Sequence, residues 1–229
     1  MRYLFPVIAG AGGAAVLVSL GLWQLDRLAW KETVLAEIEA RMSAAATPVP
    51  VPAAKADHQY LPVAISGMTG AEELHVLVSQ KQVGAGFRII TALETDDGRR
   101  LLLDHGFMRQ ESKALSRPPR PIEVEGNLLW PDERDRFTPE NDPAANFWFA
   151  RDLEDMAQRL HTEPTLVVAR TLSPPQPGVA PLPIGTEGIP NNHLGYAVQW
   201  FGMAIVWLGM TALLIRRISR RATMETQTP

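Results

Sequence analysis

Apolar residues are concentrated towards the two ends of this chain. Residues 3–25 contain no Asp, Glu, Lys or Arg, and residues 194–215 form a second uninterrupted apolar segment. A helix needs roughly 20 apolar residues to cross about 30 Å of hydrocarbon, so each segment is long enough to span a membrane. The pattern predicts one membrane helix over residues 3–25, another over residues 192–215, and a basic tail over residues 216–229.

The first helix is expected to continue beyond the membrane, to about residue 44. Residues 26–43 contain no Pro or Gly and are rich in good helix formers. The apolar positions Leu28, Leu35 and Met42 recur at helical spacing. A cleaved signal peptide is the alternative interpretation. The apolar stretch exceeds a usual signal core and no small-residue cleavage site follows it directly, so we expect a retained anchor.

Residues 45–190 show a different pattern, in which apolar and polar positions alternate. Alternation over short runs bounded by turn residues predicts strands. The expected strands cover residues 60–66, 74–80, 87–93, 100–105, 122–129 and 165–170. The expected boundaries include Gly67, Gly70, Gly84 and Gly86, and Asp97-Gly98 is the strongest hairpin signal.

A helix is expected over residues 152–161, with Asp152 as its N-cap. Six prolines between residues 174 and 190 predict an extended, irregular return towards the second apolar segment. Together the elements predict a membrane α+β protein. Two transmembrane helices would flank a β-rich domain, either an antiparallel sheet or a small barrel, with one or two helices.

Charge predicts an orientation for the two spans. Arg216, Arg217, Arg220 and Arg221 follow the second apolar segment and Arg2 precedes the first, whereas residues 26–193 carry 17 Lys and Arg against 24 Asp and Glu. Cationic residues favour the cytoplasmic side, so both termini are expected in the cytoplasm and the central domain in the periplasm of a bacterial inner membrane. Arg27 and Lys31 oppose this orientation. The net charge of -3 argues against a nucleic-acid partner.

Little in the central domain indicates catalysis. The chain has no cysteine, which excludes disulfides, Cys-based zinc or iron–sulfur sites and a thiol nucleophile. No common hydrolase, metalloprotease or P-loop motif is present, so we expect no enzyme. The acidic and basic residues at 132–136 are interpreted as a solvated loop. The isolated histidines are interpreted as surface or partly buried residues: His58, His75, His105 and His161.

The start of the second span is the strongest candidate binding site. His193, Tyr196 and Trp200 share one helix face, together with Ala197, Ala204 and Trp207. An imidazole above an aromatic stripe suits a flat apolar cofactor such as haem, and His193 is then the candidate iron ligand. The alternative is an ordinary interfacial belt of aromatic residues. The small residues Gly195, Gly202 and Gly209 could form a separate helix-packing seam.

The end of the first span adds a second group of candidates. Trp23, Arg27 and Trp30 follow one side of the helix, and Gln24, Arg27 and Lys31 lie on an adjoining side. Arg27 and Lys31 could bind haem propionates, because cationic side chains suit carboxylates. Both cations could equally reach lipid headgroups. The sequence leaves these two interpretations open.

These two junctions resemble the signatures of the surfeit locus protein 1 family. The first is residues 20–27, Leu-Gly-Leu-Trp-Gln-Leu-Asp-Arg, with Trp30 and Lys31. The second is residues 191–201, Asn-Asn-His-Leu-Gly-Tyr-Ala-Val-Gln-Trp-Phe. The resemblance extends from about residue 14 to 217. One departure occurs in the central hairpin, where His105-Gly106-Phe107 replaces the family's usual Arg-Gly-Trp.

The resemblance implies an assembly factor for a haem–copper terminal oxidase, chiefly cytochrome c oxidase. It implies transient binding of haem a and its insertion into oxidase subunit I, with His193 as the ligand of the iron. Oxidase subunit I, haem a synthase and membrane lipid are the expected partners. A scaffold that stabilises an assembly intermediate without binding haem is the alternative.

Overall fold

The computed structural model describes residues 3–80, 83–186 and 189–225. Arg2 therefore lies outside the described residues, as do residues 226–229 of the expected basic tail. The chain divides into two compact units, which we call the helix pair and the barrel domain. The helix pair is Met1–Glu37 with Glu187–Pro229, and the barrel domain is Ile38–Thr186.

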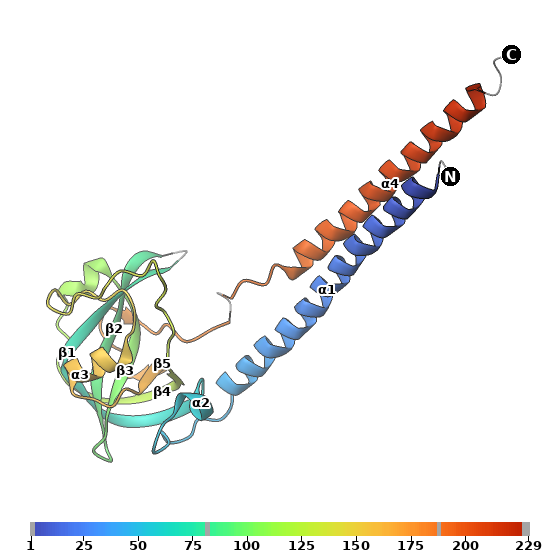
Figure 1. Cartoon of the computed structure of the whole chain (residues 1–229). Coiled ribbons are helices and arrows are strands. Elements are labelled where there is room, and N and C mark those ends of the chain that lie inside the picture. The colour runs from blue at the N-terminus through green and yellow to red at the C-terminus, as the bar shows by residue number, and fades with distance from the viewer. Residues whose placement is uncertain (1–2, 81–82, 187–188, 226–229) are drawn as a thin grey trace. The chain divides into compact units, whose positions relative to one another are not determined.

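Two long helices provide the helix pair, α1 (Leu4–Met42) and α4 (His193–Glu225). They lie side by side, and the first turns of α1 are at the same end of the pair as the last turns of α4 (Figure 1). Both are long and apolar enough to cross a membrane, with mean hydropathy of 1.9 and 1.8 over their most apolar windows. Many large apolar side chains on them are exposed, among them Phe5, Ile8, Val198 and Ile205. Such continuous apolar surface requires an apolar surrounding or partner.

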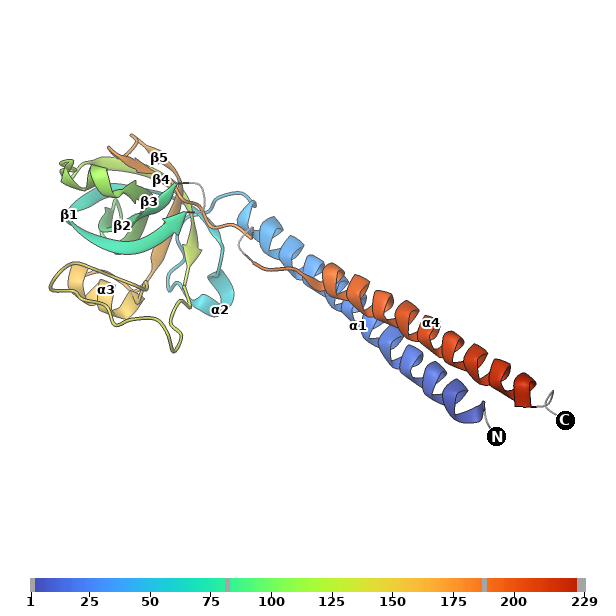
Figure 2. The ribbon, with the colours of Figure 1, turned by 90° about the horizontal axis from the view of Figure 1, so that it is seen from above.

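The barrel domain contains a closed barrel of five strands. Figure 2 shows the ribbon from above. The strands of the barrel are β1 (Pro62–Gln80), β2 (Gly84–Thr95), β3 (Arg100–Arg109), β4 (Pro121–Leu129) and β5 (Leu166–Ser173). Pairing runs from β1 to β2, β3, β5 and β4, and β4 returns to β1. All these pairs are antiparallel except β3 with β5. The sequence left an open sheet and a barrel as alternatives, and the barrel is the one that forms.

Strand β1 corrects one expectation. Gly67 and Gly70 do not separate two strands, because β1 is continuous from Pro62 to Gln80. Its first half pairs with β4 and its second half with β2, and the register shifts between Thr69 and Glu73. At Gly67 a Cβ atom would lie 2.3 Å from the carbonyl oxygen of Glu94. Glycine at this position permits a bend and a close approach of the neighbouring backbone. Inside a strand, a glycine often has this role and does not mark a turn.

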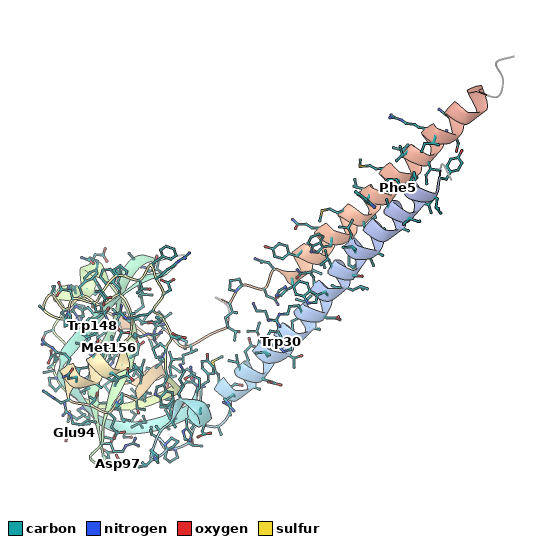
Figure 3. All side chains as sticks on the ribbon, in the orientation of Figure 1. Phe5, Trp30, Glu94, Asp97, Trp148 and Met156 are labelled. Carbon is teal, nitrogen blue, oxygen red and sulfur yellow. The ribbon has the colours of Figure 1, made fainter. Side chains whose placement is uncertain are left out.

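Two apolar layers occupy the two faces of the barrel wall. One cluster includes alternate residues of β3 and β5, namely Leu101, Leu103, Val167 and Ala169. The residues between them, Leu102, Leu166 and Val168, belong to a second cluster. This second cluster also contains the buried side chains of helix α3 (Leu153–Leu160), which are Leu153, Met156, Ala157 and Leu160. Successive strand residues face opposite sides, so the first cluster fills the barrel and the second lies under α3. Trp148 and Met156 are fully buried in this second cluster (Figure 3).

Strand β3 contains a bulge at the position of the family departure. Gly106 pairs with Ile89 and Asp104 pairs with Ile90, which leaves His105 as the extra residue. Gly106 has a φ of +114°, and a Cβ there would lie 2.2 Å from the carbonyl oxygen of Ala180. A glycine with positive φ is a common component of such bulges. The close neighbour belongs to β6 (Val179–Ala180), which pairs with β3, so the proline-rich return is not wholly irregular.

The remaining short elements are α2 (Lys55–His58) and the 3₁₀-helix η1 (Gln110–Ala114). Helix α3 begins where the sequence places it, but Asp152 makes no capping hydrogen bond within the described part of the chain. Its carboxylate instead accepts hydrogen bonds from Arg134, at 2.6 Å, and Asn141, at 2.7 Å. The loop at 132–136 is thus exposed, as expected, but is held to α3 by ionic contacts.

Candidate functional site

Helices α1 and α4 pack antiparallel through a series of contacts in reverse order. A Cβ at Gly10 would meet Thr211, a Cβ at Gly21 would meet Phe201, and Gln24 bonds His193. On α1 the buried positions Gly10, Ala14, Gly21 and Gln24 recur at intervals of four, seven and three. This spacing keeps one stripe of a helix against its neighbour, as in coiled coils.

The packing seam differs from the one expected on α4. A Cβ added at Gly195, Gly202 or Gly209 would have no neighbour within 4 Å among the described residues, so these glycines do not face α1. The glycines that allow close approach are on α1, and α4 contributes the buried Ala197 and Ala204. The expectation placed the small-residue seam on the wrong side of α4, because intervals of seven define a face without saying which face is covered.

Trp207 lies deep in the span because it contacts α1. Its indole Nε1 donates a hydrogen bond of 3.1 Å to the carbonyl oxygen of Gly10. The ring passes over Gly13, where a Cβ would be 2.4 Å from Nε1. Helix packing thus accounts for this tryptophan, which the sequence assigned to the same aromatic stripe as Tyr196 and Trp200.

Replacing Gly13 with leucine is expected to loosen the helix pair. The new side chain would displace the Trp207 indole and break a hydrogen bond of a kind worth about 0.6–1.7 kcal/mol in membranes. The melting temperature of the full chain in detergent, followed by circular dichroism, should fall by about 2–4 °C. Gly12→Leu is the matched control, because no neighbouring described atom lies within 4 Å of a Cβ at Gly12. Equal melting temperatures of the two variants would contradict the assigned packing.

His193 is the first residue of α4 and is half-buried against α1. Its ring nitrogen Nδ1 lies 2.8 Å from the side-chain oxygen Oε1 of Gln24. Gln24 is only 8% exposed, although it is polar and belongs to an otherwise apolar stretch of α1. The sequence places Gln24 beside Arg27 and Lys31 but indicates no role for it. The feature that could have indicated Gln24 is its type, because it is an uncharged polar residue on the stripe of α1 that faces α4.

The two candidate cations occupy different environments. Lys31 is half-buried, and its Nζ donates a hydrogen bond to the carbonyl oxygen of Pro190, three residues before His193. Arg27 is exposed, and its guanidinium carbon lies 3.8 Å from the ring centre of Trp30. Such a stacked guanidinium keeps its donors available at the edges. Arg27 is therefore better placed than Lys31 to bind an added anionic group.

The aromatic candidates are mostly exposed on the helix pair. Trp23 is 56% exposed and Tyr196 is 50% exposed, whereas Trp200 is half-buried. The structure thus joins His193 with Gln24, and Lys31 with the chain just before His193. Among the described residues, no pair of rings from Trp23, Tyr196 and Trp200 stacks or meets edge to face. What these three share is accessible apolar surface near one end of the helix pair.

The barrel domain holds two buried histidines, contrary to the expectation for isolated histidines. His105 is fully buried at the β3 bulge, where its Nε2 lies 2.9 Å from Oγ1 of Thr91. Burial lowers the pKa of His105 to about 4, so the ring is neutral near pH 7. His75 is also buried and lies 3.4 Å from the carboxylate of Glu73. The sequence could not reveal the burial of His105, because His105 is the extra residue of a bulge that interrupts the alternation of β3.

The barrel domain contains two clusters of buried ion pairs, one around Glu73 and one around Asp104. Arg117 donates two hydrogen bonds to Glu73, at 2.7 and 2.9 Å. Burial alone would raise the pKa of Glu73, but hydrogen bonds from His75 and Arg117 lower it to about 2. The second cluster surrounds the fully buried Asp104, which accepts hydrogen bonds from Arg88 and Arg151. Every charge in these clusters has a partner, which is typical of structural rather than reactive groups.

No group of three or more His, Asp or Glu side chains that could hold a metal ion occurs within the described ranges. A metal centre held by one protein ligand, as haem iron can be, does not need such a group. His193 fits that requirement. Its Nδ1 is hydrogen-bonded to Gln24, so the second ring nitrogen, Nε2, is the one available to bind a metal.

The chain is similar in sequence to known proteins over most of its length. The profile of the SURF1 family matches residues 11–205 of the chain. The human protein named Surfeit locus protein 1 is 31% identical over 208 residues, which cover 80% of this chain and 68% of the human protein. The Xenopus tropicalis protein of the same name is 30% identical, covering 80% of this chain and 67% of that protein. A SURF1-like protein of Monosiga brevicollis is 28% identical, covering 93% and 89%.

The fold and the site define a barrel protein with two helices suited to crossing a membrane and a single hydrogen-bonded imidazole at the start of the second. The chain belongs to the SURF1 family. Members of this family are known as cytochrome c oxidase assembly factors. The resemblance inferred from the two junctions is therefore confirmed.

Proposed function

We propose that this protein is a non-enzymatic assembly factor that binds haem a transiently at its helix pair and aids its insertion into subunit I of a haem–copper oxidase. The observation that carries the proposal is the His193–Gln24 contact of 2.8 Å. It engages one ring nitrogen and leaves the other for a metal. Family membership supports the oxidase as the destination.

The residues of the helix pair fit the haem that would be carried. His193 would provide one nitrogen to hold the haem iron, and Tyr196, Trp200 and Trp23 would offer apolar surface to the macrocycle. Arg27 would bind a propionate with the donors that its stacking on Trp30 leaves free. Lys31 would act mainly by holding the carbonyl of Pro190 and so the start of α4. One protein ligand suits release of a cargo better than permanent retention.

Orientation and partners form part of the same proposal. Both termini would be cytoplasmic, because Arg216, Arg217 and Arg220 follow the apolar part of α4. The barrel domain would then face the periplasm of a bacterial inner membrane. There it would dock onto oxidase subunit I or haem a synthase, while membrane lipid surrounds the helices. A nucleic-acid partner is not proposed.

A scaffold that stabilises an assembly intermediate without haem is the second candidate function. Trp207 favours it, since this aromatic side chain serves helix packing through Gly10 and Gly13. Part of the apparent haem-binding stripe therefore has a structural explanation. The two candidates differ in one measurable property, which is haem bound to the purified protein.

Purified full-length protein from cells that make haem a is expected to show a Soret band in detergent. His193→Ala should lose at least about nine-tenths of that absorbance, because it removes the proposed ligand of the iron. His161→Asn is the matched control, since His161 is exposed and belongs to the barrel domain. A colourless wild type made with haem a available would refute haem delivery and favour the scaffold. A Soret band unchanged in His193→Ala would refute the assigned ligand.

A further inference from the structure

Gln24 is a buried polar residue whose own role the proposed function leaves unassigned, although its contact with His193 supports that function. The large side chains around it on α1, such as Leu22, Trp23 and Leu25, are exposed, whereas Gln24 faces α4 and is 8% exposed. A buried amide is unfavourable in an apolar surrounding unless it is hydrogen-bonded. The contact that Gln24 makes is with Nδ1 of His193.

The direction of this hydrogen bond determines the state of the imidazole. The atom of Gln24 that faces the ring is the carbonyl oxygen Oε1, which only accepts hydrogen bonds. Nδ1 of His193 must therefore carry the ring proton. A neutral imidazole has one such proton, so its Nε2 carries a lone pair.

A second contact holds the chain just before His193. Lys31 lies seven residues after Gln24, two turns further along the same stripe of α1, and binds the carbonyl oxygen of Pro190. The backbone amide of Tyr196 donates to the carbonyl oxygen of Asn192, at 3.2 Å, so the first turn of α4 starts directly around His193. The chain is thus held before His193 by Lys31 and at His193 by Gln24.

We propose that Gln24 is the positioning residue of the haem site. It holds His193 in the tautomer protonated at Nδ1, so that Nε2 is the nitrogen that binds iron. Metal-binding histidines usually donate their other ring N–H to an oxygen acceptor, which fixes the ring and increases its basicity. The inference rests on the proposed function for the identity of the metal, but the tautomer is a property of the protein alone.

The tautomer can be measured without haem. In full-length protein labelled with ¹⁵N-histidine in detergent, the His193 signals are identified by their loss in His193→Ala. Wild type is expected to show a protonated Nδ1 and an unprotonated Nε2 in nitrogen NMR. Gln24→Leu, which removes the acceptor, should shift the ring towards the opposite tautomer, and Gln24→Glu should retain the wild-type pattern. An Nε2-protonated wild type, or an unchanged pattern in Gln24→Leu, would overturn the proposal.

Haem titration provides the second readout. Gln24→Leu should weaken the affinity for haem about 10–100-fold, the usual effect of losing such a partner, and Gln24→Glu should restore most of it. Gln199→Leu is the matched control, an exposed glutamine of α4 changed in the same way. Equal affinities of Gln24→Leu and wild type would refute the positioning role and leave haem binding intact. A wild type that binds no haem would refute the proposed function, while the nitrogen NMR would still decide the role of Gln24.

Discussion

Replacing Asp104 with alanine is expected to lower the free energy of unfolding of the barrel domain by about 3–5 kcal/mol. The Asp104 side chain is 0% exposed, and its Oδ2 accepts hydrogen bonds from Arg88 at 2.8 Å and Arg151 at 3.1 Å. Its Oδ1 accepts one from the backbone amide of Gly106 at 2.9 Å. The substitution would leave Arg88 without its ionic partner and a buried amide without its acceptor. Urea unfolding followed by near-ultraviolet circular dichroism of the full chain in detergent measures the effect.

Glu72→Ala is the matched control for this experiment. Glu72 also pairs with an arginine, Arg159, at 2.7 Å, but both side chains are about half exposed, at 49% and 52%. Exposed pairs contribute about 0–1 kcal/mol, because water solvates both charges after the pair is broken. Similar losses in Asp104→Ala and Glu72→Ala would show that the buried cluster does not stabilise the barrel.

The free energy of unfolding is also expected to fall by about 2 kcal/mol between pH 8 and pH 5. The cause is His105, whose pKa burial lowers to about 4, from about 6.5 in the unfolded chain. Between these values the unfolded chain binds a proton that the folded state excludes, so acid favours unfolding. This stability is fully present above pH 6.5 and is lost as the pH falls towards 4. Urea unfolding at several pH values, with the same optical signal, measures the slope.

His105→Asn should flatten this slope, whatever its effect on stability at pH 8. His161→Asn should retain it, since His161 is exposed and its left-handed backbone, with a φ of +54°, suits asparagine. Glu73 acts in a separate window. Its pKa of about 2 means that its contribution is present above pH 4.5 and is lost only as the pH falls towards 2. A slope between pH 8 and 5 that persists in His105→Asn would contradict the role of His105.

The two long helices could be predicted from the sequence because they depend on residues that are close together in the chain. An uninterrupted apolar run defines α1 and α4, and the helix-forming residues 26–43 extend α1 to Met42. Several strands could be located for a similar reason, since alternation reports two faces of a pleated surface. The expectation over residues 122–129 matches β4 within one residue at its start.

The failures share a different cause. Local preference predicts a strand boundary at Gly67 and Gly70, which is wrong. It also predicts Asp152 as an N-cap, and Asp152 does occupy that position but makes no capping hydrogen bond through its side chain. In the structure these roles depend on partners distant in sequence, such as Glu94 opposite Gly67 and Arg134 beside Asp152. Local preference is a weak guide wherever a tertiary contact satisfies the same backbone or side chain.

Only some residues of the candidate site could be predicted from the sequence. His193 and Lys31 could be selected by residue type and position at the two junctions. Gln24 could not, because nothing in one sequence shows which polar residue of α1 meets which residue of α4. Trp207 was misassigned for the same reason, since its partner, the carbonyl oxygen of Gly10, is 197 residues away in the chain.

The sequence by itself therefore determined the two membrane-suited helices, the β-rich domain between them and the family to which the chain belongs. These properties follow from composition, periodicity and short motifs, each of which depends on residues that are near one another in the sequence. Only the tertiary structure decided that the sheet closes into a barrel, that His105 is buried at a bulge and that Gln24 bonds His193. Each of these depends on which distant residues meet, because long-range packing, hydrogen bonding and burial select among locally equivalent alternatives.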